Sequence, residues 1–351
     1  MSQTAKPAVR HPSLKRNRLG LTQRDYEGSM STLCAGCGHD SVTAAIVQAF
    51  YELEIPPHRA AKLSGIGCSS KTPAYFLKEA HGFNSVHGRM PSIATGANAA
   101  NRDLVYIGIS GDGDSPSIGL GHLCHAIRRN VNMLYVLENN GVYGLTKGQF
   151  SASADVGSRA KKGEENRMKP IDPASLAMTL GASFVARSFS GDKPQLVPLI
   201  KAGLSHRGFA LVDVISPCVT FNDHEGSTKS VAFARSHEEQ LHDIDFVPHF
   251  EDIAVDYDPG ETRVVEMHDG SEIRLRKVGR DYDASDKREA LSLLEEARDE
   301  GHFYTGLIYC RPETTPCDEH LNLVEEPLAT LGEEQVRPSN EAFQEIMDSF
   351  R

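Results

Sequence analysis

Two short motifs in the middle of the chain combine glycine, carboxylate and amide groups. Gly111-Asp112-Gly113 follows an apolar run, 104–110, and Asn139-Asn140 comes twenty-five residues later, after a second apolar run, 132–137. Glycines allow a backbone to approach a pyrophosphate closely, and carboxylate and amide oxygens are the ligands that Mg²⁺ prefers in phosphate sites. A Gly-Asp turn alone is common, but the pair at this spacing predicts a magnesium–diphosphate site.

Four cysteines have a pattern that suits a metal centre. Cys34 and Cys37 form a Cys-x₂-Cys pair, which can hold one centre from a single turn, and Cys68 and Cys218 each follow a predicted strand. Together they could form a four-thiolate site, and soft thiolates select zinc or an iron–sulfur cluster. These residue types leave both metals open. The remaining cysteines are expected to be ordinary core or tail residues: Cys124, Cys310 and Cys317.

The segments around these motifs alternate between helical periodicity and short apolar runs. Apolar residues recur at helical spacing over 42–53, with Asp40 as the predicted N-cap. The other predicted elements are strands over 104–110, 132–137 and 209–216, and helices over 118–129 and from Asp172-Pro173 onward. This alternation predicts an α/β fold with a doubly wound, mostly parallel sheet. Ligands of such sheets lie beyond the carboxyl ends of the strands.

The two ends of the chain differ from this central domain, predicted over 34–223. Residues 1–33 are basic and are expected to be a solvated arm that drapes over a neighbouring subunit or docks an acidic partner. The segment 151–170 is predicted to be a long mobile loop. Residues 224–351 are predicted to form an insert with a β-hairpin, a charged helix over 284–300 and an extended C-terminal arm.

Composition excludes several classes of function. The 351 residues are 39% hydrophobic and 24% charged, which is ordinary for a soluble globular protein. No window resembles a membrane span or a secretory signal, so a cytoplasmic protein is expected. The net charge of −11 argues against broad nucleic-acid binding. An odd number of cysteines, seven, indicates a reducing compartment rather than a disulfide framework.

Taken in order, these motifs resemble a known family. The Gly-Asp-Gly and Asn-Asn pair resembles the thiamine diphosphate signature, and the whole set resembles the β subunit of the 2-oxoacid:ferredoxin oxidoreductases over 32–223. The motifs that carry the resemblance are Cys34-Ala-Gly-Cys-Gly-His39, Gly65-Ile-Gly-Cys-Ser-Ser70, His87-Gly-Arg89, Gly111-Asp-Gly-Asp114, Asn139-Asn-Gly-Val-Tyr-Gly-Leu-Thr-Lys-Gly-Gln149 and Ser216-Pro-Cys218.

The resemblance implies a division of the site residues into three groups. Asp112, Asn140 and the carbonyl of Val142 would hold Mg²⁺. The cysteines Cys34, Cys37, Cys68 and Cys218 would bind one [4Fe–4S] cluster, and only one, because no ferredoxin-like run of cysteines follows. The diphosphate and thiazolium would be lined by Ile66, Gly67, Cys68, Ser69, Ser85, Val86, His87, Gly113, Asp114, Gly144 and Leu145.

Three further side chains are candidates for function. His87 lies between two site motifs and could donate to the diphosphate or move a proton. Lys147 directly follows the magnesium turn, and its ammonium could face the second carboxylate of 2-oxoglutarate, although a solvated loop lysine is the plainer interpretation. For His39 the sequence leaves a structural and a functional role equally open.

The activity implied by the resemblance is CoA-dependent, reversible oxidative decarboxylation of 2-oxoglutarate to succinyl-CoA and CO₂, with electrons passing through the cluster to ferredoxin. Only one cofactor domain fits the chain, so an α subunit is expected to complete the site in an αβ unit or its dimer. Pyruvate or another 2-oxo acid is the main competing substrate. The sequence also leaves open a thiamine-dependent decarboxylase without a redox step and a non-catalytic zinc-binding subunit.

Overall fold

The computed structural model describes residues 13–158, 164–216, 218, 253–266, 272–301 and 303–351. The first twelve residues of the basic arm, the turn at 269–270 and the whole segment 224–252 therefore lie outside the described residues. All seven cysteines are described, and each is a free thiol. In the described part of the chain, no helix combines the length and apolar character needed to cross a membrane.

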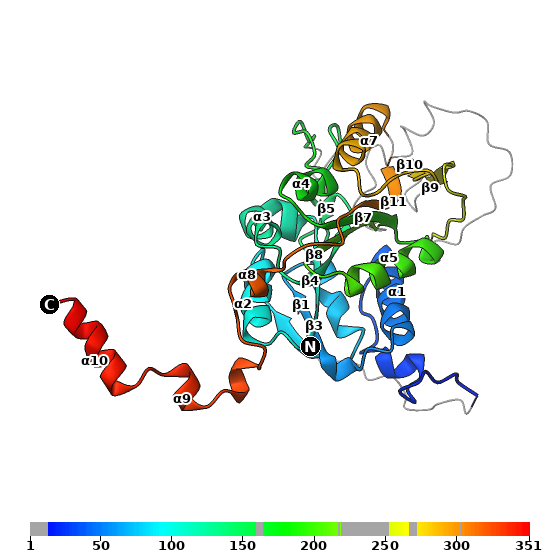
Figure 1. Ribbon diagram of the computed structural model, residues 1–351. Coiled ribbons are helices and arrows are strands. Elements are labelled where there is room, and N and C mark those ends of the chain that lie inside the picture. The colour runs from blue at the N-terminus through cyan, green and yellow to red at the C-terminus, as the bar shows by residue number, and fades with distance from the viewer. Residues whose placement is uncertain (1–12, 159–163, 217, 219–252, 267–271, 302) are drawn as a thin grey trace.

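A nine-stranded sheet forms the centre of the molecule (Figure 1). Six neighbouring strands of this sheet, β2, β1, β3, β4, β8 and β7, run parallel to one another. This arrangement confirms the doubly wound, mostly parallel sheet. In their order across the sheet the strands are β2 (His81–Asn84), β1 (Ala60–Ser64), β3 (Val105–Gly111), β4 (Met133–Asn139), β8 (Phe209–Ile215), β7 (Phe184–Phe189), β11 (Phe303–Cys310), β10 (Glu272–Lys277) and β9 (Thr262–Glu266).

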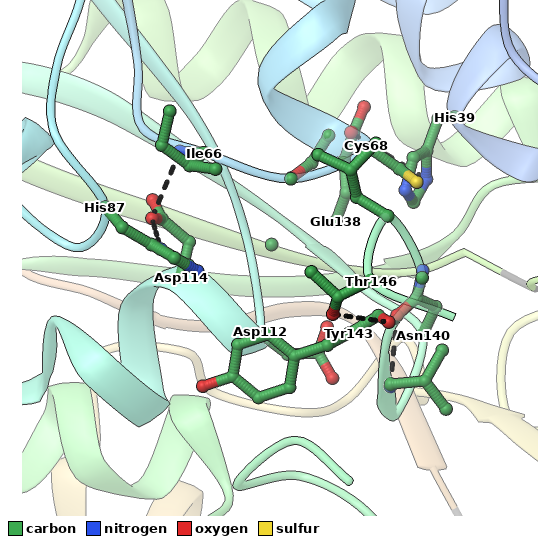
Figure 2. A pocket seen from close by; sticks show the side chains of 17 residues that line it. His39, Ile66, Cys68, His87, Asp112, Asp114, Glu138, Asn140, Tyr143 and Thr146 are labelled. Atoms are coloured by element: carbon green, nitrogen blue, oxygen red, sulfur yellow. Dashed lines mark hydrogen bonds and ion pairs between the residues drawn. The ribbon is translucent and has the colours of Figure 1, made fainter. Parts of the chain in front are cut away.

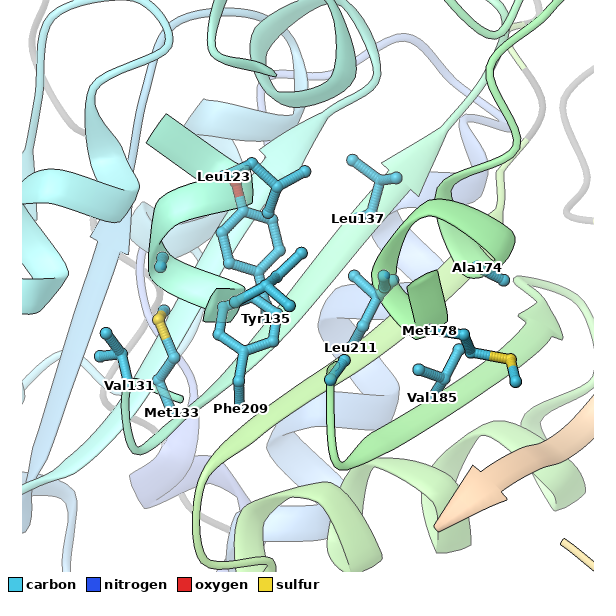
Figure 3. Close-up of a cluster of buried hydrophobic side chains, with 14 of the residues drawn as sticks. Leu123, Val131, Met133, Tyr135, Leu137, Ala174, Met178, Val185, Phe209 and Leu211 are labelled. Atoms are coloured by element: carbon cyan, nitrogen blue, oxygen red, sulfur yellow. The ribbon is translucent and has the colours of Figure 1, made fainter. Parts of the chain in front are cut away.

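Helices cover both faces of the sheet and create two separate cores. On one face lie α1 (Gly38–Glu52) and α5 (Lys193–Ser205). On the other lie α2 (Met90–Ala100), α3 (Leu120–Arg128), α4 (Pro173–Thr179) and α7 (Lys287–Glu300). Successive residues of β4 alternate between the cores: Tyr135 and Leu137 pack in the second (Figure 3), and Leu134 and Val136 in the first. Because a strand buried on both faces has apolar residues on both sides, its sequence is a continuous apolar run.

The ends of two helices test the capping predictions. At α4, the Asp172 side chain accepts a 2.7 Å hydrogen bond from the Ser175 N–H, so the predicted cap is confirmed. At α1 the prediction was wrong: the helix begins at Gly38 with Cys37 as N-cap, and Asp40 lies within the first turn. A carboxylate in the first turn still favours the helix through its interaction with the helix dipole.

The N-terminal arm folds onto its own chain where it is described, which corrects the expectation of a solvated tail. Tyr26 is fully buried against α1 and Phe76, and its carbonyl accepts a hydrogen bond from the Leu77 N–H at 2.7 Å. Asn17 donates to the Tyr26 hydroxyl at 2.9 Å. Residues 13–28 are therefore part of the central domain.

The C-terminal region also differs from the prediction. The expected extended arm begins with a strand, β11, which pairs antiparallel with β7 and parallel with β10, so residues assigned to the insert complete the central sheet. Beyond it, α8 (Cys317–His320) lies against the body, where Arg102 donates to Asp318 at 2.6 Å. The final segment, with α9 (Glu333–Val336) and α10 (Asn340–Ser349), extends away from the body (Figure 1).

Candidate functional site

A pocket opens where β1, β3 and β4 end, at the carboxyl edge of the parallel strands (Figure 2). Its walls come from the loops that follow these three strands, with one residue from α1 and one from the loop after β2. The lining residues are His39, Ile66, Gly67, Cys68, Ser69, His87, Gly111, Asp112, Gly113, Asp114, Glu138, Asn140, Val142, Tyr143, Gly144, Leu145 and Thr146. Most of the predicted cofactor-binding residues thus lie around one pocket.

The predicted magnesium ligands lie together in this pocket. Asp112 is buried, and its Oδ2 accepts hydrogen bonds from the hydroxyls of Ser151, at 2.5 Å, and Ser153, at 2.7 Å. Asn140 Oδ1 accepts from the Val142 N–H at 3.2 Å, which orients the amide within the turn. A carboxylate, an amide and a backbone carbonyl form an all-oxygen donor set, so these residues fit Mg²⁺. The two serines were not predicted from the sequence.

Asp114 ties the walls of the pocket together. Its Oδ1 accepts hydrogen bonds from the Ile66 N–H at 3.2 Å, the Gly88 N–H at 2.6 Å and His87 Nδ1 at 2.5 Å, and its Oδ2 accepts from Ser110 at 2.7 Å. A Cβ atom at Gly65 would lie 2.0 Å from the carboxylate, so only glycine fits beside it. The role of Asp114 that follows from these contacts is to position His87 and the loop after β1.

Apart from the cluster cysteines, three predicted site residues lie outside the pocket lining. The Ser85 hydroxyl donates to the Ser64 carbonyl at 3.0 Å, which holds β2 against β1, and the Val86 side chain is 75% exposed. Lys147 is also exposed and has a φ of 78° in the turn of the short hairpin β5 (Val142–Tyr143) and β6 (Gln149–Phe150). His87, by contrast, is held by Asp114 through Nδ1, which leaves Nε2 as the nitrogen for other partners.

Of the four predicted cluster cysteines, Cys68 lines the pocket itself. A Cβ atom at Gly144 would lie 3.3 Å from Cys68 Sγ and 3.9 Å from Cys218 Sγ, so both sulfurs lie against the backbone of the turn after Asn140. Burial raises the pKa of the Cys68 thiol, and the neighbouring Cys218 and Cys34 raise that pKa further. Burial likewise raises the pKa of Cys37, with Glu138 and Cys218 adding to the effect. Cys218 thus influences both Cys68 and Cys37, and Cys34 influences Cys68.

The spacing of these thiols bears on which metal group they suit. Among the described residues, no three Cys, His, Asp or Glu side chains converge closely enough to hold a single ion. Thiolates around one zinc ion, at Zn–S distances of about 2.3 Å, must lie within roughly 4 Å of one another. A cuboidal cluster interposes iron and sulfide between its cysteines and spaces them farther apart. The described residues thus provide no closely packed site for one zinc ion.

A buried carboxyl group, Glu138, was missed because the predicted strand ended at Leu137. Glu138 is fully buried on β4 and lines the pocket, and neither of its oxygens has a hydrogen-bond partner in the described structure. Burial raises its pKa well above the ordinary value. His39 Nδ1 lies 3.7 Å from Glu138 Oε2 and 2.6 Å from the Ser216 hydroxyl, and burial lowers the pKa of His39 to about 4. His39 is therefore neutral near pH 7, and burial favours the protonated form of Glu138.

Comparison with known proteins agrees with this geometry. Residues 65–214 match the family described as "Thiamine pyrophosphate enzyme, C-terminal TPP binding domain", so the fold and pocket define a thiamine diphosphate-binding α/β domain. The 2-oxoglutarate synthase subunit KorB of Methanocaldococcus jannaschii is 34% identical over 212 residues, 60% of this chain and 75% of that protein. The chain belongs to the β subunits of the 2-oxoacid:ferredoxin oxidoreductases, as its motifs predicted.

Two further relatives show how far the similarity extends. The 2-oxoacid:ferredoxin oxidoreductase subunit beta of a Sulfolobus species is 44% identical over 191 residues, 54% of this chain. That alignment spans 63% of the relative's own length. The structure titled 2-oxoglutarate:ferredoxin oxidoreductase from Magnetococcus marinus with 2-oxoglutarate, coenzyme A and succinyl-CoA bound matches with a TM-score of 0.71 and 31% identity, covering 92% of this chain and 98% of that one. The similarity in fold therefore reaches well beyond the aligned motifs.

Proposed function

We propose that this β subunit holds the diphosphate half of thiamine diphosphate, its Mg²⁺ and one [4Fe–4S] cluster in an enzyme that converts 2-oxoglutarate and coenzyme A to succinyl-CoA and CO₂. The reaction is reversible, and its electrons pass to ferredoxin. The enzyme is cytoplasmic and requires an α subunit, which completes the cofactor site in an αβ unit or its dimer.

The observation that carries this proposal is the position of Cys68. It lines the same pocket as Asp112 and Asn140, and its sulfur lies with that of Cys218 against Gly144. The turn after Asn140 thus separates the proposed oxygen ligands of Mg²⁺ from the thiols of Cys68 and Cys218. A redox group on these cysteines would lie close to a cofactor in the pocket, which keeps single-electron transfer short.

The residues of this chain would bind the cofactor and Mg²⁺ and orient them. Thiamine diphosphate, when bound, supplies the carbanion and the electron sink that decarboxylation requires. Asp112, Asn140 and the Val142 carbonyl would hold Mg²⁺, and the glycine-bounded loop at 111–113 lets backbone approach the diphosphate. Asp114 fixes the ring of His87, so that Nε2 can donate to or accept from a bound group. The four cysteines would hold the cluster.

Substrate preference is proposed to involve Lys147. It is exposed on the hairpin turn, so it can reach the second carboxylate of 2-oxoglutarate only where the α subunit closes over this face. We expect Lys147→Ala in the αβ enzyme to raise KM for 2-oxoglutarate without raising KM for pyruvate. An unchanged preference between the two acids would remove Lys147 from the proposal.

The experiment that tests the function is an anaerobic visible and EPR spectrum of the chain co-purified with its α subunit, before and after addition of 2-oxoglutarate. A broad band near 400 nm that bleaches with a radical signal supports the cluster, the thiamine chemistry and the substrate together. A response to pyruvate alone would keep the family and make pyruvate the substrate. A colourless complex that contains zinc would overturn the redox function.

A matched pair of cysteine variants tests the cluster assignment. Cys218→Ser in the complex should lower bound iron and acid-labile sulfide by at least half, because one of the four ligands is lost. Cys310→Ser, at the end of β11 and away from the pocket lining, should leave both contents unchanged. Equal iron in the two variants would contradict the assignment of Cys218.

A further inference from the structure

The metal-binding carboxylate of Asp112 is constrained on one of its two oxygens. Ser151 and Ser153 both direct their hydroxyls at Asp112 Oδ2, at 2.5 and 2.7 Å. A carboxylate oxygen has two lone-pair directions, and these two hydroxyls occupy them. A metal ion that bound both oxygens of Asp112 would have to displace at least one of these hydroxyls.

The two serines are themselves held in position. The backbone between them is fixed at Ala152, whose N–H donates to Ser117 at 2.8 Å and whose carbonyl accepts from the Ile171 N–H at 2.8 Å. Ser153 also lies 2.8 Å from Asn139 Oδ1, with which it shares its single hydroxyl hydrogen. The pair is therefore preorganised before any metal arrives.

A buried charge network extends this support. Asn139 Nδ2 donates to Asp213 at 3.2 Å, which orients its carbonyl oxygen toward Ser153. Arg187 donates to Asp213 at 2.8 Å and to Asp172 at 2.7 Å. Because Arg187 and Asp213 are both fully buried, this network is rigid, and the orientation of Asn139 and of the serine beside it follows from the packing of β7 against β8.

We propose that Ser151 and Ser153 are positioning residues that make Asp112 a one-oxygen ligand and thereby select Mg²⁺ over Ca²⁺. Mg²⁺ requires near-ideal octahedral geometry with six ligands, whereas Ca²⁺ accepts six to eight and commonly takes a carboxylate through both oxygens. Restricting Asp112 to one oxygen removes a ligand that only the larger ion can use. This inference rests on the proposed function, which assigns the metal to Asp112.

The test is calorimetric titration of the metal-free αβ complex with MgCl₂ or CaCl₂ in the presence of thiamine diphosphate. Ser151→Ala and Ser153→Ala should each lower the ratio of Mg²⁺ to Ca²⁺ affinity about tenfold. Ser153→Thr, which keeps the hydroxyl, should restore the ratio to within about threefold of the wild type. Ser158→Ala is the matched control, because Ser158 lies in the same loop and donates to the Asp155 backbone carbonyl at 2.5 Å and not to the Asp112 carboxylate.

The outcomes separate this inference from the proposed function. An unchanged affinity ratio in both alanine variants, with both metals still bound, would overturn the selectivity role alone. The same loss of ratio in Ser158→Ala would also overturn it, because the effect would then come from loop packing. A wild-type complex that binds neither metal with thiamine diphosphate would overturn the proposed function and this inference together.

Discussion

Asp114 shows how much of the pocket depends on a single side chain. Its carboxylate accepts hydrogen bonds from two backbone N–H groups, from His87 and from Ser110, and so joins the loops after β1, β2 and β3. The carboxylate oxygens of Asp114 are buried, so water cannot replace these hydrogen bonds when the carboxylate is removed. The residue acts on the cofactor site through other residues.

We expect Asp114→Asn to destabilise the chain by roughly 2–4 kcal/mol, because the amide has one acceptor oxygen where the carboxylate has two and aims its NH₂ group at other donors. Urea unfolding of wild type and variant measures this difference. Asp103→Asn, at an exposed position, is the control and should change stability by less than about 0.5 kcal/mol. Equal destabilisation by both variants would contradict the role of Asp114.

At the residue scale, the sequence predicts which residues line the pocket better than which side chains support them. The presence of Asp112, Asn140 and Cys68 in the pocket was predictable because few residue types do their proposed chemistry and their spacing is specific. Ser151 and Ser153 were not, because a polar loop gives no sign of which hydroxyl meets the carboxylate. Glu138 was not, because carboxylates are rarely fully buried, and the exposure of Val86 and Lys147 depends on tertiary structure.

Among the helices, α4 has an N-cap that also forms a partly buried ion pair. Asp172 caps α4 and accepts a hydrogen bond from Arg187. Burial alone would raise the pKa of Asp172, but the Arg187 guanidinium and the Ser175 N–H lower it below its usual range. The carboxylate is therefore charged at neutral pH and partly neutralises the buried guanidinium.

Asp172→Ala should cost about 2–3 kcal/mol of unfolding free energy: about 1 for the cap and the rest for the weakened pairing of Arg187, which keeps Asp213. Asp286→Ala, at the exposed N-cap of α7, isolates the capping contribution and should cost only about 1 kcal/mol. Chemical denaturation of the two variants compares them. If Asp172→Ala costs no more than Asp286→Ala, the ion pair contributes nothing.

A second prediction concerns β1, where Lys62 is a buried lysine. Its ammonium donates to the carbonyls of Phe76 and Leu77, at 2.6 and 2.9 Å, and burial lowers its pKa to about 8. In the unfolded chain a lysine has a pKa near 10.4. Between these two values the unfolded chain binds a proton that the folded chain does not, so the stability contributed by Lys62 rises with pH.

We expect the stability of the wild type relative to Lys62→Met to increase by roughly 2–3 kcal/mol between pH 7.5 and 10.5. Denaturation of both proteins across this range measures the difference and cancels the titration of other groups. Parallel curves for the two proteins would show that Lys62 is not shifted.

The sequence predicts an element correctly where the apolar pattern of that element does not depend on distant parts of the chain. The strands β3, β4 and β8 are apolar on both faces and were found within about two residues. β11 was missed because its place in the sheet comes from pairing with β7, and Arg187 and its partner Gly306 lie 119 residues apart in sequence. The start of α1 was misjudged because Cys37, not a usual capping residue, precedes it.

At the scale of the whole molecule, the C-terminal arm is the described segment with the fewest ties to the rest. In the described chain, α10 presents an exposed apolar stripe, at helical spacing, on Phe343, Ile346, Met347 and Phe350. The anchor of the arm lies earlier, where Arg102 contacts Asp318 and the Leu323 carbonyl. Stability of the folded chain should therefore not depend on the residues beyond this anchor.

Truncation after Glu325 should shift the Tm of the chain by less than about 2 °C, because the removed residues bury little surface. It should also reduce self-association, measured by light scattering, because the apolar stripe is gone. The intact chain under the same conditions is the control. A fall in Tm of more than about 5 °C would show that the arm packs on the body.

The pairing of β7 with β11 has a consequence for how the chain is made. β8 ends at Ile215 and β11 begins at Phe303, 88 residues later. At roughly 5–20 residues per second, a ribosome leaves the outer edge of β7 without its neighbour for about 4 to 18 seconds. An open strand edge invites pairing with other nascent chains. Arg187 lies on β7 and pairs with Asp213 on the neighbouring β8, so a charged residue is in place on the edge strand before β11 is made. Charged residues on an edge strand disfavour pairing with foreign strands.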